Sequence, residues 1–243
     1  DPTRMFVRST PDGGSAHIYN DFDPNWYKKY TELPYVAETG IHTMCCTATG
    51  LKVVAADQCK DLGGMYKEEF KNTHPDFVHH FAEYSAWRVP RMLSRASHVE
   101  DISDPSYEEV VEATNVGAGE FYQIMSESLQ CMYPVTTGMM PWVLNRPWPV
   151  VGGIQILDYF GQPTGPYYFL KRTYEQTHVM LDLPRMLFAP GDSFDINAKV
   201  LNGLGMDYAR LAELMQSRTD KFSSIPAMIG FLKEMPEFSN DLY

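Results

Sequence analysis

Apolar and polar residues alternate in short runs over the first forty positions, which predicts β-strands separated by loops. These runs lie at residues 5–7, 16–19 and 33–37, with turn-forming residues between them. The third run ends at Glu38, and Gly40 follows two positions later. A strand that ends at a carboxylate is typical of barrel enzymes, which present catalytic groups from a rigid sheet. Glu38 could equally be an ordinary strand-end residue in a salt bridge at the rim.

Helical spacing replaces this pattern in the middle of the chain. Apolar residues recur three or four positions apart over 61–71 and 75–84, which predicts two helices there. The clearest helix is predicted to begin at Asp104-Pro105, because Asp can cap a helix and Pro suits the first turn, and to end before residue 134.

The second half of the chain returns to strands and then to helix. We expect strands at 136–144 and 153–157 and a helix at 166–174. Strands with a period of two are expected at 178–183 and 194–200, and a helix is expected over 206–235. Alternation of strands and helices favours an α/β architecture with parallel strands. The strands with a period of two indicate the start of a β-sandwich, followed by a helical tail.

Composition narrows the possible partners. The 243 residues suffice for one large domain, or for one domain and part of another. The formal net charge of −11 argues against nucleic acid as a partner, because phosphate binding needs clustered Lys and Arg. The sequence contains no run of 18 apolar residues, so it predicts no membrane-spanning helix. Asp1 is not an initiator residue, so a leader sequence could have been removed or left out. Secretion or export to the periplasm therefore stays open.

Several chemical classes have no supporting motif. The four cysteines do not form a disulfide framework in a chain of this length, and no ligand spacing typical of zinc is present. The chain also has no glycine-rich nucleotide loop and no nucleophile elbow of the GxSxG type. We therefore expect no metal and no cofactor.

Aromatic and polar residues are interleaved in two segments that could hold a sugar. Trp142 and Trp148 flank Asn145 within a proline-rich stretch, and such an aromatic wall suits the apolar face of a sugar ring. The loop that begins with His17 and Tyr19 has a similar mixture. Both tryptophans could instead fill the core, and the loop could be solvated. Asp158 could be either a structural turn acid or a ligand contact.

Together, these segments resemble glycoside hydrolase family 2, and most closely its β-mannosidase and exo-β-glucosaminidase branch. The matching segments occur in the family's order: DPTR (1–4), PDGGSAH (11–17), VAETG (36–40), PWVLNRPWP (141–149), LDYFG (157–161) and PYYFLK (166–171). The resemblance implies the second half of a (β/α)8 TIM barrel in 1–175. It also implies the start of an immunoglobulin-like β-sandwich in 176–205 and leaves a helical tail in 206–243.

The same resemblance implies a retaining β-glycosidase that acts on a β-mannoside or a related β-glycoside. Glu38 matches the family's nucleophile, and Trp142 would be the sugar platform. Five further residues are candidates for sugar contacts: His17, Tyr19, Asn145, Trp148 and Asp158. The expected partners are a carbohydrate substrate and the remainder of a parent enzyme chain.

Two departures from the family pattern limit this expectation. Arg146 stands where β-mannosidases usually carry Asp, and the Asn-Glu pair that holds the family's acid/base is missing. We therefore expect that this chain alone does not hydrolyse glycosides and that it needs a longer parent or a partner segment. Two alternatives stay open: a non-catalytic carbohydrate-binding protein, and a structural module in which Glu38 and the tryptophans only pack.

Overall fold

The computed structural model describes residues 8–11, 15–19, 26–27, 35–133, 135–184 and 188–202. The chain divides into one unit of residues 1–175 with 181–197, and a second of 176–180 with 198–243. The strand predicted at 5–7 and the helical tail predicted from 206 lie outside the described residues. Within the described part, no helix has the length and apolar character needed to cross a membrane.

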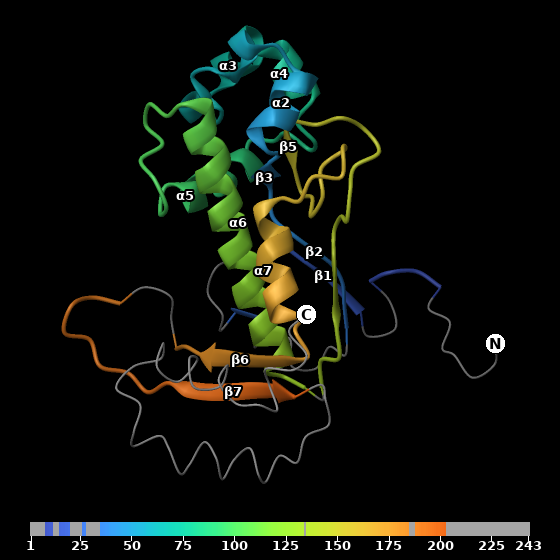
Figure 1. The fold of residues 1–243 in the computed structure, drawn as a ribbon, viewed down its shortest axis with the longest axis vertical. Helices are drawn as coiled ribbons and strands as arrows, with labels where there is room; N and C mark the ends of the chain where they lie inside the picture. Colours follow the sequence, from blue (N-terminus) through green and yellow to red (C-terminus); the bar gives the residue numbers. More distant parts are fainter. Residues whose placement is uncertain are drawn as a thin grey trace. The chain divides into compact units, whose positions relative to one another are not determined.

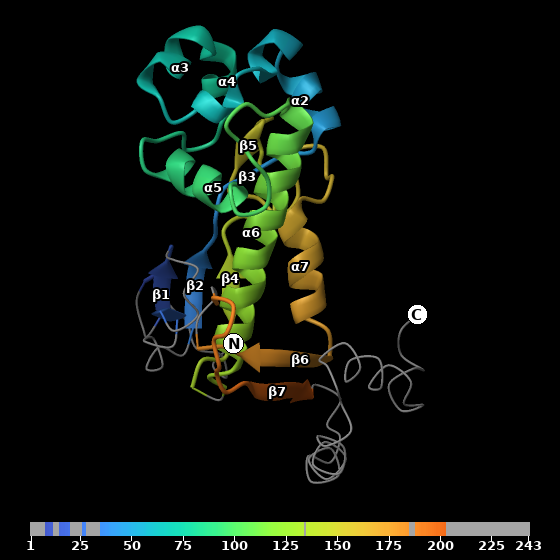
Figure 2. The same cartoon turned by 90° about the vertical axis from the view of Figure 1, so that its left-hand side faces the viewer.

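Three parallel strands form the sheet that carries Glu38. Strand β2 (Tyr35–Thr39) lies between β1 (Ser15–Ile18) and β4 (Met139–Pro141) (Figures 1 and 2). Because all three run in the same direction, their carboxyl ends meet at one edge of the sheet. A register shift in β1 brings His17 opposite Glu38. The predicted strands at 16–19 and 33–37 are confirmed, except that Glu38 lies within β2 and not after it.

The two strands predicted after residue 135 are much shorter than expected. The first is reduced to β4, because Pro141 has no N–H with which to extend the ladder. The second is reduced to β5 (Gly152–Gly153), which pairs with β3 (Thr43–Met44). Beyond β5, the N–H groups of residues 156 and 157 donate to the carbonyl groups of residues 143 and 144. Irregular pairing between two loops therefore replaces the expected strand.

The longest helix is α6 (Tyr107–Gln130), and it confirms the strongest helix prediction. Its predicted start at Asp104 is wrong, because Ser106 is the N-cap. The Ser106 hydroxyl accepts from the Glu109 N–H at 3.2 Å, and the Glu109 carboxylate accepts from the Ser106 N–H at 2.7 Å. This reciprocal capping box satisfies two N–H groups that would otherwise be unpaired at the start of the helix.

Helix α6 belongs to two hydrophobic clusters. Its first turns pack with the segment between residues 44 and 93, through Tyr107, Val110 and Val111. Its later turns pack with the sheet, through Ala118, Phe121, Tyr122, Met125 and Leu129. Twenty-four residues span about 36 Å, so one helix connects both clusters (Figure 2).

The segment between β3 and α6 is built from short helices. They are α2 (Thr47–Val53), η1 (Ala56–Cys59), η2 (Leu62–Gly64), α3 (Glu68–Thr73), α4 (Pro75–His79) and α5 (Arg88–Ala96). The helix predicted over 61–71 is split into η2 and α3, because the backbone is extended at Lys67, with φ −84° and ψ 144°. The helix predicted over 75–84 ends at His79. Helices α2 and α5 were not predicted.

Helix α7 (Gly165–Thr173) confirms the helix predicted at 166–174, and it lies beside α6 (Figures 1 and 2). The contact is close because Gly119 has no side chain: a Cβ there would lie 2.2 Å from Cδ2 of Phe169. Asn115 adds a polar link, since its Oδ1 accepts from the Gly165 N–H at 2.6 Å.

Strands β6 (Thr177–Asp182) and β7 (Asn197–Asn202) form a separate two-stranded sheet. They confirm that strands occur in the two ranges where apolar and polar residues alternate. Strand β7 begins three residues later than predicted. The β-sandwich to which they would belong stays a prediction.

His42, three residues after β2, is buried in the core at 4% exposure. Its ring stacks on that of Phe81, with centroids 5.9 Å apart and planes 3° apart. Burial, with the charges of Arg88 and Arg146 as smaller causes, lowers the pKa of His42 from 6.5 to about 3. The imidazole is therefore neutral at neutral pH.

Replacing Gly119 by Ala should destabilise the fold, because the added Cβ would meet the Phe169 ring. We expect a loss of about 1–2 kcal/mol after allowing for the better helix propensity of Ala, seen as a fall in Tm of roughly 2–6 °C. Gly64→Ala is the matched control, since the nearest atom to its Cβ would be 3.9 Å away. Equal Tm values for the two variants would contradict the proposed role of close packing.

His42 should make the protein less stable in acid. Its folded pKa lies below its unfolded value, so the unfolded state binds the extra proton, and stability is lost as pH falls from about 6.5 towards 3. Between pH 7 and pH 5, wild type should lose about 1–2 kcal/mol more unfolding free energy than His42→Phe. Urea unfolding at the two pH values measures this difference. The exposed His98→Gln serves as control and should follow wild type.

Candidate functional site

Glu38 lies among polar side chains at the carboxyl ends of β1 and β2. The Tyr19 hydroxyl donates to Glu38 Oε1 at 2.5 Å, and His17 Nδ1 lies 3.7 Å from Glu38 Oε2. The Glu38 side chain is 24% exposed, so it is reachable while its backbone is held inside the sheet. The structure thus brings together three of the predicted site residues.

Tyr19 is suited to donate this hydrogen bond at all physiological pH values. Burial, together with the hydrogen bond to Glu38 and its negative charge, raises the pKa of Tyr19 well above its ordinary value of 10.0. The phenol therefore keeps its proton. A protonated donor at this distance holds the Glu38 carboxylate in position.

Trp142 is fixed next to the end of β2. Its N–H donates to the carbonyl of Thr39 at 2.7 Å, and its own carbonyl lies 3.5 Å from the Tyr122 hydroxyl. Gly40 makes this approach possible, since a Cβ there would lie 2.6 Å from the Trp142 carbonyl oxygen. The peptide bond after Trp142 is cis. The indole is 41% exposed, so it is not core filler.

The structure does not bring the other predicted residues to Glu38. Trp148 stacks on His80, with centroids 5.3 Å apart and planes 6° apart, and remains 50% exposed. Asn145 is exposed on the loop between the two tryptophans. Trp148 is therefore part of an aromatic pair formed with the end of α4.

Asp158 is in a buried turn. It is 1% exposed and accepts hydrogen bonds from the Thr49 hydroxyl at 2.5 Å and from the N–H groups of Phe160 and Gln162 at 2.9 and 2.8 Å. These contacts account for both carboxylate oxygens. Of the two interpretations left open, they favour the structural turn acid.

Glu83 is an important residue that the sequence patterns did not reveal. It has a left-handed backbone at φ 60°, which is uncommon for a residue with a side chain. Its Oε2 lies 2.8 Å from Arg88 Nη1 and 3.6 Å from His42 Nε2, and its Oε1 lies 3.4 Å from Arg146 Nη2. One carboxylate thus connects three separate segments around the site. No motif marks it, because two of these partners, His42 and Arg146, are distant from it in sequence.

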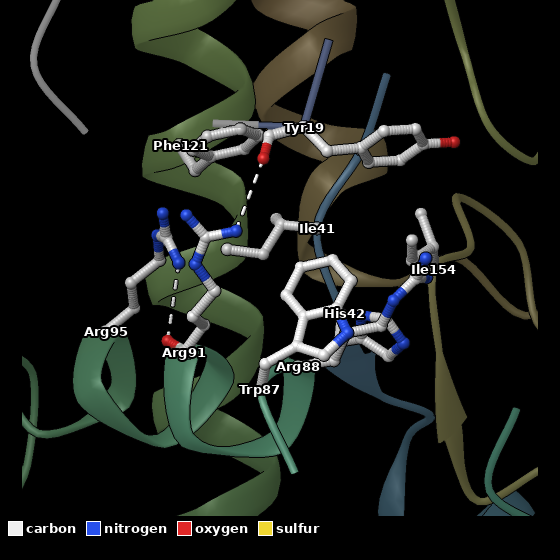
Figure 3. Close-up of a pocket in the computed structure, with 10 residues that line it drawn as sticks. Tyr19, Ile41, His42, Trp87, Arg88, Arg91, Arg95, Phe121 and Ile154 are labelled. Carbon is white, nitrogen blue, oxygen red and sulfur yellow. Dashed lines mark hydrogen bonds between the residues drawn. The ribbon is translucent and has the colours of Figure 1, made fainter. Parts of the chain in front are cut away.

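A pocket lies beside the Glu38 site, between β2, α5 and α6 (Figure 3). Its empty space, open solvent included, is about 330 Å³. It is lined by Tyr19, Gly40, Ile41, His42, Trp87, Arg88, Arg91, Arg95, Phe121 and Ile154. The three arginines come from one face of α5, and their spacing of three and four positions is the sequence signal that could have identified them. Among the described residues, no group of His, Cys, Asp or Glu is placed to hold a metal ion.

Comparison with known proteins gives matches at the level of structure. No protein-family model and no curated protein sequence matches this chain. The β-D-mannosidase from Dictyoglomus thermophilum is similar over 67% of this chain and 18% of its own, with a TM-score of 0.53 and 20% identity. The Amycolatopsis orientalis exo-chitosanase CsxA is similar over 68% of this chain and 20% of its own, with a TM-score of 0.49 and 20% identity.

The chain therefore spans only about a fifth of the length of these glycoside hydrolases. The higher TM-score supports a shared fold, and the low identity limits the conclusion to the fold. This shared fold agrees with the branch of the family that the ordered sequence motifs indicated independently. The chain is a mixed α/β polypeptide with the fold of part of a β-mannosidase-like glycoside hydrolase.

Proposed function

We propose that this chain is the C-terminal half of the catalytic barrel of a retaining β-glycosidase and that it carries the nucleophile, Glu38. The observation that carries this proposal is the contact of Glu38 with Tyr19 and His17 at the carboxyl edge of a parallel sheet. Barrel enzymes place their catalytic groups at this edge. Trp142, held next to the same strand end, supplies an exposed ring on which a sugar can stack.

Glu38 would act by double displacement. Its ionised carboxylate attacks the anomeric carbon and forms a covalent glycosyl–enzyme intermediate, while the leaving oxygen is protonated by a second carboxylic acid. Water then attacks the same carbon and releases Glu38. The hydrogen bond from Tyr19 holds one carboxylate oxygen in place, so the other oxygen is oriented towards the substrate.

The second carboxylic acid would come from outside this chain. Retaining enzymes hold their two carboxyl groups about 5–5.5 Å apart, and the family's Asn-Glu pair is missing from the sequence. Glu83 is poorly suited to replace it, because its carboxylate is already paired with the guanidinium groups of Arg88 and Arg146. We propose that the first half of the barrel, on the remainder of a parent chain, supplies the acid/base.

The order of elements supports the half-barrel. Strand β2 leads through α6 to the parallel strand β4, and α7 follows, as in consecutive β/α units. Within the described residues, β1 and β4 each pair with β2 alone. Strands from the remainder of the parent would extend the sheet at these edges and close the barrel.

A non-catalytic carbohydrate-binding module is the alternative. The observation in its favour is the exposure of Trp142 and Trp148 in a chain without an acid/base pair. Sugar binding that is lost in Trp142→Ala, with no turnover by any longer parent, would support this alternative.

Replacing Glu38 by Gln in the full-length parent should abolish turnover while preserving sugar binding. The amide cannot attack the anomeric carbon, so we expect kcat to fall by at least about 10³-fold. The measurement is hydrolysis of aryl β-glycosides together with calorimetric binding of the product sugar. Asp158→Asn is the matched control, since it should lower the Tm more than it lowers kcat. Substantial activity in the Glu38→Gln parent would refute the nucleophile assignment.

Removing the Tyr19 hydroxyl should slow the reaction without preventing folding. In a Tyr19→Phe parent, Glu38 loses its closest donor, and we expect kcat to fall by about 10–10³-fold with a much smaller change in KM. Steady-state kinetics with an aryl β-glycoside measures both constants. Tyr168→Phe, an exposed position on α7, is the control. An unchanged kcat would exclude this role for Tyr19.

A further inference from the structure

We propose that the pocket beside Glu38 binds a planar aromatic ring and that the substrate is a neutral β-glycoside whose leaving group is a phenol. This inference deepens the proposed function and rests on it for the identity of the ring as a leaving group. The preference of the pocket for a planar ring can be measured without catalysis.

Trp87 presents an exposed indole to the pocket. It is the N-cap residue of α5, it lines the pocket, and it is 51% exposed. The guanidinium carbons of Arg88 and Arg91 lie 4.7 and 5.4 Å from the centre of its ring. These cation–π contacts hold the indole in one orientation. An exposed aromatic ring that is already oriented is a suitable surface on which a second ring can stack.

The guanidinium groups of the pocket are themselves stacked on aromatic rings (Figure 3). Arg88 lies over the Tyr19 ring at 5.8 Å as well as over Trp87. Arg95 lies over the Phe121 ring at 5.0 Å. The wall of the pocket thus combines aromatic rings with planar cations. Both present flat faces, and an aromatic ligand can stack on either.

The rest of the lining is apolar and offers little to a sugar. Ile41 and Ile154 are both buried side chains that face the pocket (Figure 3). The described residues that line it include no Asp, Glu, Asn, Gln, Ser or Thr. Arginine side chains provide no acceptor for a sugar hydroxyl, and Nε2 of His42 is buried. The lining therefore suits an aromatic ring better than a second sugar.

The pocket adjoins the place where the sugar itself would stack. Gly40 lines the pocket, and a Cβ on this residue would lie 2.6 Å from the carbonyl oxygen of Trp142. Tyr19 also belongs to both places, since it lines the pocket and its hydroxyl donates to Glu38. A sugar that is held at Glu38 and stacks on Trp142 would therefore have its leaving group next to the pocket.

The size of the pocket suits a single ring. Its empty space is about 330 Å³ with open solvent included. An apolar cavity of about 150 Å³ is sufficient for benzene, whereas sites for drug-sized ligands measure about 300–1,000 Å³. Because part of the 330 Å³ is open solvent, the pocket has room for one ring and not for a chain of sugars.

The test is a titration of the 243-residue chain, carrying ¹³C-labelled isoleucine methyl groups, with three probes. They are phenyl, cyclohexyl and methyl β-D-mannoside, followed through the methyl signals of Ile41 and Ile154. The phenyl probe should bind about tenfold more tightly than the methyl probe, because it buries a ring. It should bind about threefold more tightly than the cyclohexyl probe, which is similarly apolar but cannot stack.

Variants of Trp87 assign this preference to the pocket. Trp87→Leu should weaken binding of the phenyl probe about tenfold and leave the methyl probe unchanged. Trp87→Phe retains a planar ring and should keep most of the preference. Tyr66→Leu, at an exposed position that does not line the pocket, is the control and should behave as wild type. The comparison of the phenyl and cyclohexyl probes in wild type depends on no variant, so it decides the question if Trp87→Leu fails to fold.

Equal binding of the phenyl and cyclohexyl probes, no binding of any probe, or an unchanged preference in a folded Trp87→Leu variant would overturn the inference. Its failure is distinguishable from failure of the proposed function. A parent that hydrolyses no β-glycoside, although the chain prefers the phenyl probe, would refute only the glycosidase. A parent that hydrolyses β-mannosides, although the chain binds phenyl and cyclohexyl probes alike, would refute only the aromatic leaving group.

Discussion

The parallel pairing of β2 with β1 and β4 is the constraint on which the candidate site depends. It places the ends of three strands at one edge, so that His17 lies opposite Glu38 and the backbone of Trp142 bonds to Thr39, the last residue of β2. The middle strand is almost completely buried, which leaves its register little freedom to slip. Tyr35 and Glu38 are its half-buried residues, and the Glu38 side chain is 24% exposed.

Helix α6 holds this sheet and the short-helix segment in one hydrophobic framework. Small residues allow its close contacts, with Gly119 against Phe169 and Gly117 against the backbone of Arg95. The second contact matters for the site, because α5 carries the arginines of the pocket. Packing far from Glu38 therefore sets the position of the charges beside it.

An acid and two arginines from separate segments are paired near the site. The Glu83 carboxylate lies 2.8 Å from Arg88 Nη1 and 3.4 Å from Arg146 Nη2. Arg146 stands where β-mannosidases usually carry Asp. The departure from the family motif is thus accompanied by an acid from another segment.

Short-range patterns were sufficient for several elements. The period of two located β6 and β7, and helical spacing located α6. Strand-end chemistry and the ordered motifs made Glu38, Tyr19 and His17 candidate residues, and these three lie in contact. The helix and the strands depend on neighbours in sequence, so the sequence alone determined them, and the roles of the three candidates stay predictions.

Only the tertiary structure decided the remainder. It separated Trp148 and Asp158 from the group, because a histidine ring and a buried turn provide their partners. It also revealed Glu83 and the arginine pocket, whose contacts join segments as many as 72 residues apart. Hydrogen bonds and ion pairs act over a few ångströms in space, and distance along the chain does not predict which side chains come that close.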